Sequence, residues 1–505
     1  MNFEYIIVQA GGLGSRLEHL TKNRSKAMVP VNNAPILFHL FRKYPKKKFI
    51  IIGDYKFEEF SNYLSCFAPV DYILIQSIEK GNVSGLDQSL GYLPEQSPFM
   101  IIWSDLILSE DFETDSLKNG CYVGVSDRFT CSWSFSDGVL EKKSTTQTGV
   151  AGCFLFDCKT KLQNLPKGGS FTKYLKQSDL DLQHFSMEST KEVGSLEGIS
   201  ELEKDYQHRC RPYNSIEMGE TQVVKRGLTP EANTLIDREI VWFDAVKKCG
   251  FTGIPQVISL DPLTTERIYG ENLFLTPLSD PEKKETITRL CEKLDNLHHL
   301  QTGEVNYFDL QKEYEQKTLD RLVGIAPSIP FHHQKEIKIN GKLCRNILMD
   351  RTYFRHLIDR IMVPSEFGLL HGDCTFTNSL INGDGDIFFI DPRGYFGNTP
   401  LIGDVYYDWA KIYYSIVGRF DQFNVKRFSL EIGENEVNFS INPSGWEGFT
   451  DYFLSLIPNC NLYRLKLIHG IVWLSLASHC WEDFDSMCLA YYHGLYLLHG
   501  LEEEK

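Results

Sequence analysis

The stretch Tyr5-Ile6-Ile7-Val8-Gln9-Ala10-Gly11-Gly12-Leu13-Gly14-Ser15-Arg16-Leu17 lies near the start of the chain and is an apolar, β-branched run that breaks into a glycine-rich turn. This order predicts a parallel strand, then a loop whose backbone amides hold a phosphate at the start of a helix. The dinucleotide fingerprint G-x-G-x-x-G is not matched, because Arg16-Leu17 stand where its third glycine would be, and the sequence contains no P-loop Gly-Lys-Ser/Thr. We therefore expect this loop to bind a nucleotide without either of those motifs.

Length and composition favour a protein of at least two domains in a reducing compartment. A chain of 505 residues is too long for one ordinary core. The net charge of -15 argues against nucleic acid as a partner. The 13 cysteines are scattered without a CxxC pair, as expected for reduced thiols. No apolar run reaches the length of a membrane span, so we expect a cytoplasmic protein without signal peptide or membrane insertion.

In the first part of the chain, runs of strand-forming residues alternate with helical patterns, which predicts a mostly parallel sheet flanked by helices. The strand candidates are Ile6–Val8, Phe49–Ile52, Tyr72–Ile75, Phe99–Trp103, Tyr122–Val125 and Cys153–Phe156, and the early helix candidates are Ile36–Lys43 and Phe57–Phe67. In such a sheet the ligand lies outside the carboxyl ends of the strands. The loops that follow Val8, Ile52 and Trp103 should therefore meet.

The opening stretch continues with Leu20-Thr21, Ser25-Lys26-Ala27-Met28 and Pro30-Val31. Together with the glycine-rich turn, these residues closely resemble the signature of nucleotidyltransferases that join a nucleoside triphosphate to a sugar-1-phosphate or to phosphocholine and release pyrophosphate. The resemblance covers roughly residues 5–205. It implies a Rossmann-like, mixed-sheet nucleotidyltransferase domain over residues 1–205, in which Arg16 neutralises the leaving pyrophosphate and Lys26 bridges phosphates of both substrates. The expected nucleotide-binding residues of this domain are Gly11, Gly12, Gly14, Ser15, Gly81 and Ser84.

A magnesium site is expected beside the same loop. Asp105 comes just after a buried strand and matches the metal-binding aspartate of the nucleotidyltransferases. Their second metal carboxylate stands in an Asp-x-Gly-Thr/Ser pattern, where this chain has Glu192-Val193-Gly194-Ser195. Glutamate for aspartate moves the carboxylate by about one methylene, so Glu192 departs from the pattern while keeping the chemistry of a hard oxygen ligand.

The strongest signal of the second part is His371-Gly372-Asp373-Cys374-Thr375-Phe376-Thr377-Asn378, followed by Ile387-Phe388-Phe389-Ile390-Asp391-Pro392-Arg393-Gly394. These loops resemble the catalytic and metal loops of small-molecule kinases of the aminoglycoside phosphotransferase and choline kinase type. The resemblance implies a bilobal, protein-kinase-like α+β domain over residues 206–505, with lobes of about 206–270 and 271–505. In it Asp373 accepts the proton of the substrate hydroxyl, while Asn378 and Asp391 hold Mg²⁺ on the phosphates of ATP.

Several further residues of the second part have candidate roles in this resemblance. Lys225 is placed as the lysine on the ATP phosphates and Glu239 as its partner on a helix, with Glu231 as the alternative. Arg393 could bind substrate or pair with an acid. The aromatic residues of the C-terminal helices belong to the core or form a cage for a quaternary amine, and they include Trp409, Tyr413, Tyr414, Trp473 and Trp481.

The two motif sets together predict a bifunctional enzyme. ATP phosphorylates a small hydroxyl compound, and the resulting phosphate is coupled to a nucleoside triphosphate, with CTP favoured, to give an activated donor such as CDP-choline or a CDP-alcohol for a capsule or other surface glycan. An alternative is a sugar kinase joined to a sugar-1-phosphate nucleotidyltransferase that makes an NDP-sugar. In a second alternative one module is inactive and serves in regulation or binding. The small substrate and the oligomeric state stay open, a homo-oligomer included.

Overall fold

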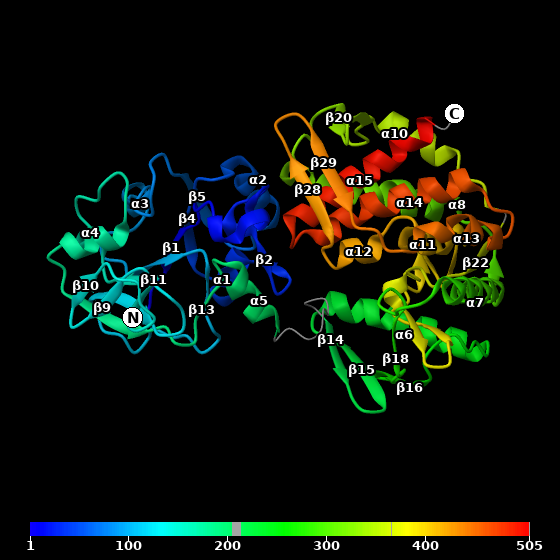
Figure 1. The fold of residues 1–505 in the computed structure, drawn as a ribbon, viewed down its shortest axis with the longest axis horizontal. Helices are drawn as coiled ribbons and strands as arrows, with labels where there is room; N and C mark the ends of the chain where they lie inside the picture. The colour runs from blue at the N-terminus through cyan, green and yellow to red at the C-terminus, as the bar shows by residue number, and fades with distance from the viewer. Residues whose placement is uncertain (205–213, 365, 504–505) are drawn as a thin grey trace. The chain divides into compact units, whose positions relative to one another are not determined.

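The computed structural model describes residues 1–204, 214–364 and 366–503 (Figure 1). The chain divides into two compact units. The first comprises Met1–Arg209, Pro327–Pro330 and Trp481–Phe484, and the second comprises Cys210–Ala326, Phe331–Cys480 and Asp485–Lys505. The predicted boundary between residues 205 and 206 lies outside the described residues, so the proposed domain limits stay a prediction.

The first unit is built on a mixed sheet of nine strands, in the order β10-β9-β11-β6-β1-β4-β5, with β8 paired to β11 and β12 to β8. Strands β6, β1, β4 and β5 run parallel, whereas β11 is antiparallel to β6. The sheet is Rossmann-like, as the sequence predicts. Its strands are β1 Tyr5–Gln9, β4 Lys48–Gly53, β5 Tyr72–Gln76, β6 Phe99–Trp103, β8 Cys121–Ser126, β9 Ser134–Ser136, β10 Val139–Glu141, β11 Gly149–Phe156 and β12 Leu182–Ser186.

Helices α1 (Ile36–Lys43) and α2 (Phe57–Phe67) begin and end where the sequence predicts them. The other helices of this unit are α3 Leu86–Leu90, α4 Phe171–Gln177 and α5 Leu196–Lys204. The central strands are buried on both faces, with Ile7 and Ile50 at 0% and 1% exposure. Continuous β-branched runs are typical of such strands, because helices cover both sides of a parallel sheet.

The second unit combines small sheets with a large helical part. Strands β14 (Asn214–Met218), β15 (Gln222–Gly227), β17 (Leu263–Glu266) and β16 (Val257–Leu260) form one antiparallel sheet in that order. Helix α6 (Pro230–Lys248) follows β15 and is capped by the hydroxyl of Thr229, which accepts from the backbone N–H of Ala232. The residues 211–213, which the sequence places in the first of these strands, lie outside the described ranges.

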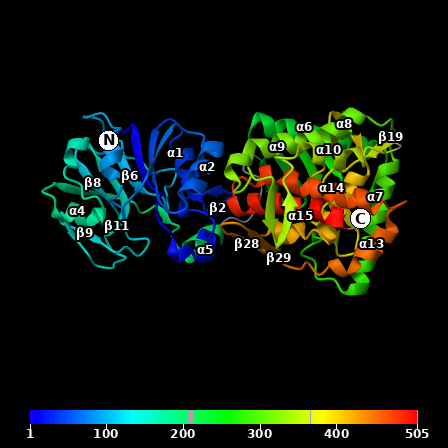
Figure 2. The same cartoon turned by 90° about the horizontal axis from the view of Figure 1, so that it is seen from above.

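The helical part of the second unit contains α7 Asp280–His299, α8 Tyr307–Gln311, α9 Lys317–Ile325, α10 Arg351–Asp359, α11 Tyr406–Ile416, α12 Phe420–Asn424, α13 Thr450–Leu456, α14 Leu462–Leu476 and α15 Phe484–Glu503. Figure 2 shows α14 beside α15, where Gly470 and Gly494 leave room for leucines of the partner helix. Strand β18 (Gly270–Asn272) pairs with β23 (Ser379–Asn382), which pairs with β24 (Ile387–Phe389). The predicted lobe limit at 270 and 271 falls inside β18.

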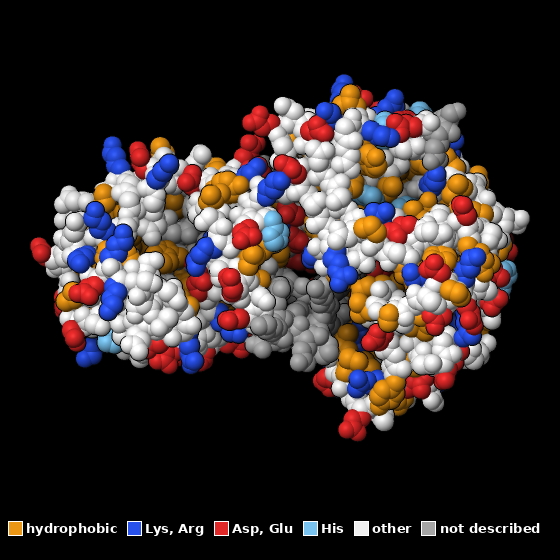
Figure 3. Space-filling model, in the orientation of Figure 1, with side chains coloured by type: hydrophobic (Ala, Val, Ile, Leu, Met, Phe, Trp, Pro, Cys, Tyr) orange, Lys and Arg blue, Asp and Glu red, His pale blue; other side chains and the backbone are white. Residues whose placement is uncertain are grey.

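Among the described residues, no helix is both long and apolar enough to cross a membrane. Acidic and basic side chains are interspersed on the face drawn in Figure 3.

A bulge in strand β11 gives Trp103 its place at the end of β6. The pairing of β11 with β8 shifts register between Val150 and Phe154. Gly152 lies in that shift with φ of 90°, and a Cβ on it would stand 2.1 Å from the Trp103 ring. The strand that leads to Asp105 therefore depends on a residue without a side chain.

We expect Gly152→Ala to lower the free energy of unfolding of the first unit by about 3 kcal/mol, since a left-handed φ and a blocked Cβ both act against alanine. Gly138 has a φ of 79° and nothing within 4 Å of its Cβ position. Gly138→Ala should therefore cost only about 1 kcal/mol. Urea unfolding of both variants measures the difference, and equal losses would contradict the role given to the Trp103 contact.

Candidate active sites

The glycine-rich loop connects β1 to a short helix, Ser15–Thr21, at the place where the sequence predicts a helix, and this helix is of the 3₁₀ type. Gly14 adopts a φ of 69°, and Glu18 interrupts the helix with a φ of 47°. Two left-handed residues so close together prevent a continuous i to i−4 hydrogen-bond ladder. Gly12 and Ser15 are exposed, so the loop offers its own open backbone amides to a ligand.

The three loops at the carboxyl edge of the sheet do meet. The backbone N–H of Ala10 donates to the carbonyl of Ile52 at 2.8 Å, and that of Ser104 donates to Gln9 at 3.2 Å. A Cβ on Gly11 would lie 2.8 Å from the Cβ of Asp54. Gly11 is therefore required by the close approach of the loop that follows β4.

Four charged residues of the first unit form two ion pairs near this edge. Lys26 Nζ contacts Asp105 Oδ2, and Arg16 Nη2 lies 2.7 Å from Glu192 Oε1. Strand β13 (Lys191–Glu192) pairs antiparallel with β7 (Leu106–Ile107), which brings Glu192 beside the end of β6. The structure thus places Arg16, Lys26, Asp105 and Glu192, which are distant in sequence, in one group.

Gly194 joins the two ion pairs. A Cβ on this residue would lie 2.3 Å from Glu192 Oε1, 2.7 Å from Lys26 Nζ and 2.8 Å from Asp105 Oδ2. The three charged groups therefore surround one backbone position. A side chain there would occupy the space in which a phosphate or a cation contacts them.

The donor set of this group fits a magnesium ion. Asp105 is 8% exposed, and its Oδ1 is buried without a hydrogen-bond partner among the described residues. A second carboxylate, Glu192, is near, and Mg²⁺ completes its shell with waters and substrate phosphates. Within the described ranges no cluster of three or more His, Cys, Asp or Glu side chains could hold a metal ion. Any ion here would accordingly depend on the nucleotide for part of its ligands.

Gly81 and Ser84 make contacts that hold their own loop. A Cβ on Gly81 would lie 2.2 Å from the carbonyl oxygen of Gly169, and its φ is 101°. The Ser84 hydroxyl is buried and accepts from the backbone N–H of Glu79 at 3.1 Å. Both residues thus fix the conformation of the loop that precedes α3. Their contact with a nucleotide stays a prediction.

In the second unit, the predicted catalytic loop is compact. Asn378 Nδ2 donates to the backbone carbonyl and to Oδ2 of Asp373, both at 2.9 Å. Lys411 Nζ lies 3.0 Å from Asp373 Oδ1. The amide and the ammonium therefore hold the carboxylate of Asp373 from two sides.

Lys225 on β15 joins helix α6 to the second predicted metal loop. Its Nζ lies 2.7 Å from Glu239 Oε2 and 2.8 Å from Asp391 Oδ1. Burial would lower the pKa of Lys225, but the carboxylates of Asp391 and Glu239 outweigh it and raise the pKa. Burial raises the pKa of Glu239 to about 7, against the opposing effect of Lys225. The alternative Glu231 is exposed.

Asn378 and Asp391 have the ligand chemistry that the predicted magnesium site of the second unit requires. One supplies an amide oxygen and the other a carboxylate, both of them hard oxygen ligands. Asp391 has a φ of 55°, a left-handed conformation that is uncommon for a residue with a side chain. Its carboxylate is 47% exposed and uses Oδ1 for Lys225. An ion bound to ATP phosphates could therefore reach it.

Two supporting residues of this site were missed in the sequence. The buried Asp408 accepts from the backbone N–H groups of His371 and Gly372 at 2.9 and 2.7 Å. Lys411 follows three residues later, on the same face of α11. A signal was available, because an Asp and a Lys three residues apart in an apolar helix indicate charges that need buried partners.

His371 supports the loop that carries Asp373. Its Nδ1 accepts from the backbone N–H of Asp373 at 3.2 Å. Burial lowers the pKa of His371, so the imidazole is neutral and can accept this bond.

Four of the five aromatic residues named as cage candidates do not form a cage. Trp409, Tyr413, Tyr414 and Trp473 are 0 to 5% exposed. They pack as core, for example Tyr414 against Trp473 with ring centroids 4.8 Å apart. Aromatic residues at helical spacing on an apolar helix bury more area than any other side chains, which explains their place in the core.

Residues 5–118 match the nucleotidyl transferase family. The bifunctional protein GlmU of Methanocaldococcus jannaschii is 30% identical over 127 residues, which are 24% of this chain and 29% of that protein. The protein of the same name from Methanococcus maripaludis is 26% identical over 110 residues, 21% of this chain and 26% of that one. The chain thus spans less than a third of the length of these relatives.

Two solved structures are also similar to the first unit. HddC from Yersinia pseudotuberculosis is 18% identical with a TM-score of 0.35, and covers 41% of this chain and 100% of its own. The CTP:phosphocholine cytidylyltransferase from Streptococcus pneumoniae is 19% identical with a TM-score of 0.33, at the same coverage. From the family match, the first unit resembles a nucleotidyl transferase domain, as the sequence predicts.

A pH-dependent stability is expected from Asp421, which supports the predicted catalytic loop through Thr377. Its Oδ1 accepts from the Thr377 hydroxyl at 2.6 Å, and burial raises the pKa of Asp421 from 3.8 to about 6. A raised carboxyl pKa means that stability is lost as pH rises from the unfolded to the folded pKa. Asp421→Asn should therefore stabilise the second unit by up to about 3 kcal/mol above pH 7 and by less at pH 5.

Urea unfolding of the second unit between pH 5 and pH 8 measures this effect. The exposed Asp384, changed to Asn, provides a control of the same chemistry on a surface turn. A difference between Asp421→Asn and wild type that is the same at pH 5 and pH 8 would contradict the assignment.

Proposed function

We propose that the chain is a bifunctional enzyme in which the second unit phosphorylates a small hydroxyl compound with ATP and the first unit couples that phosphate to a nucleoside triphosphate. The observation that carries the proposal is the presence of two separate phosphate-directed groups of side chains in one chain. One surrounds Lys26 and Asp105, and the other surrounds Lys225 and Asp373. Either reaction alone would account for only one of these two groups of side chains.

In the first unit, the proposed reaction is an in-line displacement at the α-phosphorus. An oxygen of the acceptor phosphate attacks, and pyrophosphate leaves. The Arg16 side chain is 60% exposed, so it could stay in contact with the pyrophosphate as it leaves. The Lys26 side chain is 13% exposed and is therefore more deeply buried. Catalysis of this kind depends on positioning and on neutralising charge, which these cations and the open loop amides can supply. Asp105 and Glu192 would hold Mg²⁺, which neutralises the triphosphate when bound.

In the second unit, the proposed reaction transfers the γ-phosphoryl group of ATP to a hydroxyl. Asp373 would accept the hydroxyl proton, while Lys225, positioned by Glu239, would contact the ATP phosphates. Lys411 already lies 3.0 Å from Asp373 and supplies a cation where charge develops. Asn378 and Asp391 would hold the magnesium ion of ATP. Asp408 acts as a positioning residue, since its carboxylate accepts from the backbone N–H groups of His371 and Gly372 and contacts His298.

For the nucleotide, we favour CTP, on the resemblance of Leu13-Gly14-Ser15-Arg16 to the phosphocholine enzymes. The product would then be a CDP-linked donor for a capsule or surface glycan. The sugar alternative gives an NDP-sugar instead. One observation supports the sugar alternative over choline, because four of the five aromatic residues named as cage candidates are buried in the core.

An inactive first unit is the remaining alternative. It would rest on Glu192, which stands where an aspartate is expected. The ion pair of Glu192 with Arg16 at 2.7 Å keeps its carboxylate within the group of charged residues. The longer side chain is therefore still directed at the site that it would serve.

Single substitutions should separate the two activities. Asp373→Asn should lower ATP consumption with the hydroxyl acceptor by roughly 10²- to 10⁴-fold, the range of a lost general base, and leave pyrophosphate release from a supplied phosphorylated acceptor unchanged. Lys26→Ala should do the reverse, with pyrophosphate release lowered by roughly 10²- to 10³-fold. Release of ADP and of pyrophosphate is measured across candidate alcohols, sugars and the four NTPs.

The exposed Lys46, changed to Ala, is the matched control for Lys26, since it removes a lysine of the same unit outside the charged group. If Asp373→Asn still made the nucleotide-linked product from unphosphorylated acceptor, ATP and NTP, the coupled scheme would be wrong. Pyrophosphate release without ATP consumption on any acceptor would instead favour one inactive module.

A further inference from the structure

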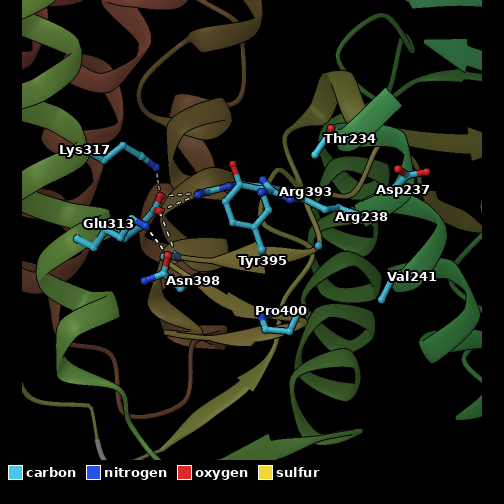
Figure 4. A pocket seen from close by; sticks show the side chains of 13 residues that line it. Thr234, Asp237, Arg238, Val241, Glu313, Lys317, Arg393, Tyr395, Asn398 and Pro400 are labelled. Atoms are coloured by element: carbon cyan, nitrogen blue, oxygen red, sulfur yellow. Dashed lines mark hydrogen bonds and ion pairs between the residues drawn. The ribbon is translucent and has the colours of Figure 1, made fainter. Parts of the chain in front are cut away.

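A cavity of about 560 Å³ lies in the second unit, next to the proposed kinase site (Figure 4). Helix α6 lines one side with Asp237 and Arg238, and the segments 312–317 and 393–400 line the others. Gly394 has a φ of 72°, and a Cβ on it would stand 2.9 Å from the carbonyl oxygen of Arg238. The segment that follows Asp391 is therefore held against α6, and the cavity is part of the fold.

The charged side chains that line the cavity are unequal in sign. The cations are Arg238, Lys312, Lys317 and Arg393, and the carboxylates are Asp237 and Glu313. The Glu313 side chain is 1% exposed, and its Oε1 and Oε2 accept hydrogen bonds from Arg393 Nη1 and Nη2 at 2.5 and 2.6 Å. Lys317 Nζ also contacts Glu313 Oε1. One buried carboxylate thus serves two cations.

Two further observations indicate a positive potential in the cavity. Arg238 and Arg393 both make cation–π contacts with the Tyr395 ring, with their Cζ atoms 4.3 and 4.2 Å from its centroid (Figure 4). Burial lowers the pKa of Lys317, and the nearby cations Arg393, Arg321 and Lys411 lower it further. A concave site with a surplus of one sign of charge favours ligands of the opposite sign.

The cavity is connected to the predicted catalytic loop by direct contacts. The backbone N–H of Arg393 donates to the carbonyl of His371 at 2.8 Å. Lys411, which contacts Asp373, shares the Tyr407 ring with Arg393, their charged groups lying 5.8 and 5.5 Å from its centroid. The segment that lines the cavity is therefore bonded directly to the loop that carries Asp373.

We propose that the acceptor of the kinase reaction carries a carboxylate or phosphate group of its own, which binds in this cavity between Arg238, Lys312 and Arg393. The inference rests on the proposed kinase activity and names its substrate class, an anionic sugar or polyol. A trimethylammonium group would instead meet like charges. In the transfer, the acceptor oxygen forms a bond to the γ-phosphorus, the bond from that phosphorus to the bridging oxygen of ADP breaks, and the proton passes to Asp373.

Small hydroxyl compounds of different charge test the inference. The full chain with ATP is assayed for ADP release with glucuronate and glucose 6-phosphate as anionic acceptors, glucose as the neutral one, glucosamine as the cationic one, and choline. We expect the KM for at least one anionic hexose to be roughly 10- to 100-fold below those of glucose, glucosamine and choline, the range of a charge-assisted hydrogen bond. Equal or better use of glucose, glucosamine or choline would overturn the inference.

Substitutions assign the preference to the cavity. The double variant Arg238→Gln/Lys312→Gln should raise the KM for the anionic acceptor roughly 10- to 100-fold and leave the KM for ATP unchanged. Lys248→Gln is the matched control, because Lys248 is on the same helix, is 72% exposed and is not among the lining residues. An unchanged acceptor KM in the double variant would overturn the assignment.

Calorimetric titration separates the failure of this inference from failure of the proposed function. Wild type should bind glucuronate or glucose 6-phosphate, the double variant should not, and Asp373→Asn should still bind. Absent binding to wild type, or equal binding by wild type and the double variant, overturns the inference. Binding that depends on the cavity, without ATP consumption by wild type, overturns the kinase activity instead.

Discussion

The buried carboxylate of Asp408 holds the loop that carries Asp373 in the second unit. It is fully buried, yet its pKa is lowered, because the cost of burial is outweighed by His298 and by the backbone N–H groups of His371 and Gly372. A buried charge without such donors would cost several kcal/mol. The loop that carries Asp373 thus has one conformation in which this charge is satisfied, and helix α11 imposes it.

The same constraint operates differently in the first unit. There the carboxylates of Asp105 and Glu192 are balanced by Lys26 and Arg16, which are side chains and can exchange partners. A triphosphate bound at the glycine-rich loop, as we propose, would offer new anionic oxygens to both cations. Backbone donors keep one loop in place, whereas mobile side-chain cations let the other site redistribute charge when a ligand binds.

Local patterns predicted much of the fold and less of the sites. Continuous β-branched runs and amphipathic helices gave α1, α2 and β6 with their observed limits, because burial on two faces or one leaves a periodic pattern. The helix after Gly14 was predicted but its 3₁₀ type was not, since the break at Glu18 depends on a backbone conformation without a residue preference. The contacts of Lys26 with Asp105, and of Lys411 with Asp373, join distant segments. Motif resemblance named Lys26, Asp105 and Asp373. The spacing of Asp408 and Lys411 on an apolar helix was a further signal, whereas Glu313 is found only through the fold.

Glu313 has a further consequence for how long a ligand stays in the cavity. Arg393 already donates two hydrogen bonds to this carboxylate, and a guanidinium has five N–H donors in all. An incoming anion shares the cation with Glu313 and cannot take it over completely. Competition from Glu313 would therefore lower the affinity of Arg393 for the anion. Without a ligand, Glu313 keeps Arg393 hydrogen-bonded, so the bound anion would leave sooner. Such a balance suits a site that must let its product go before the next turnover.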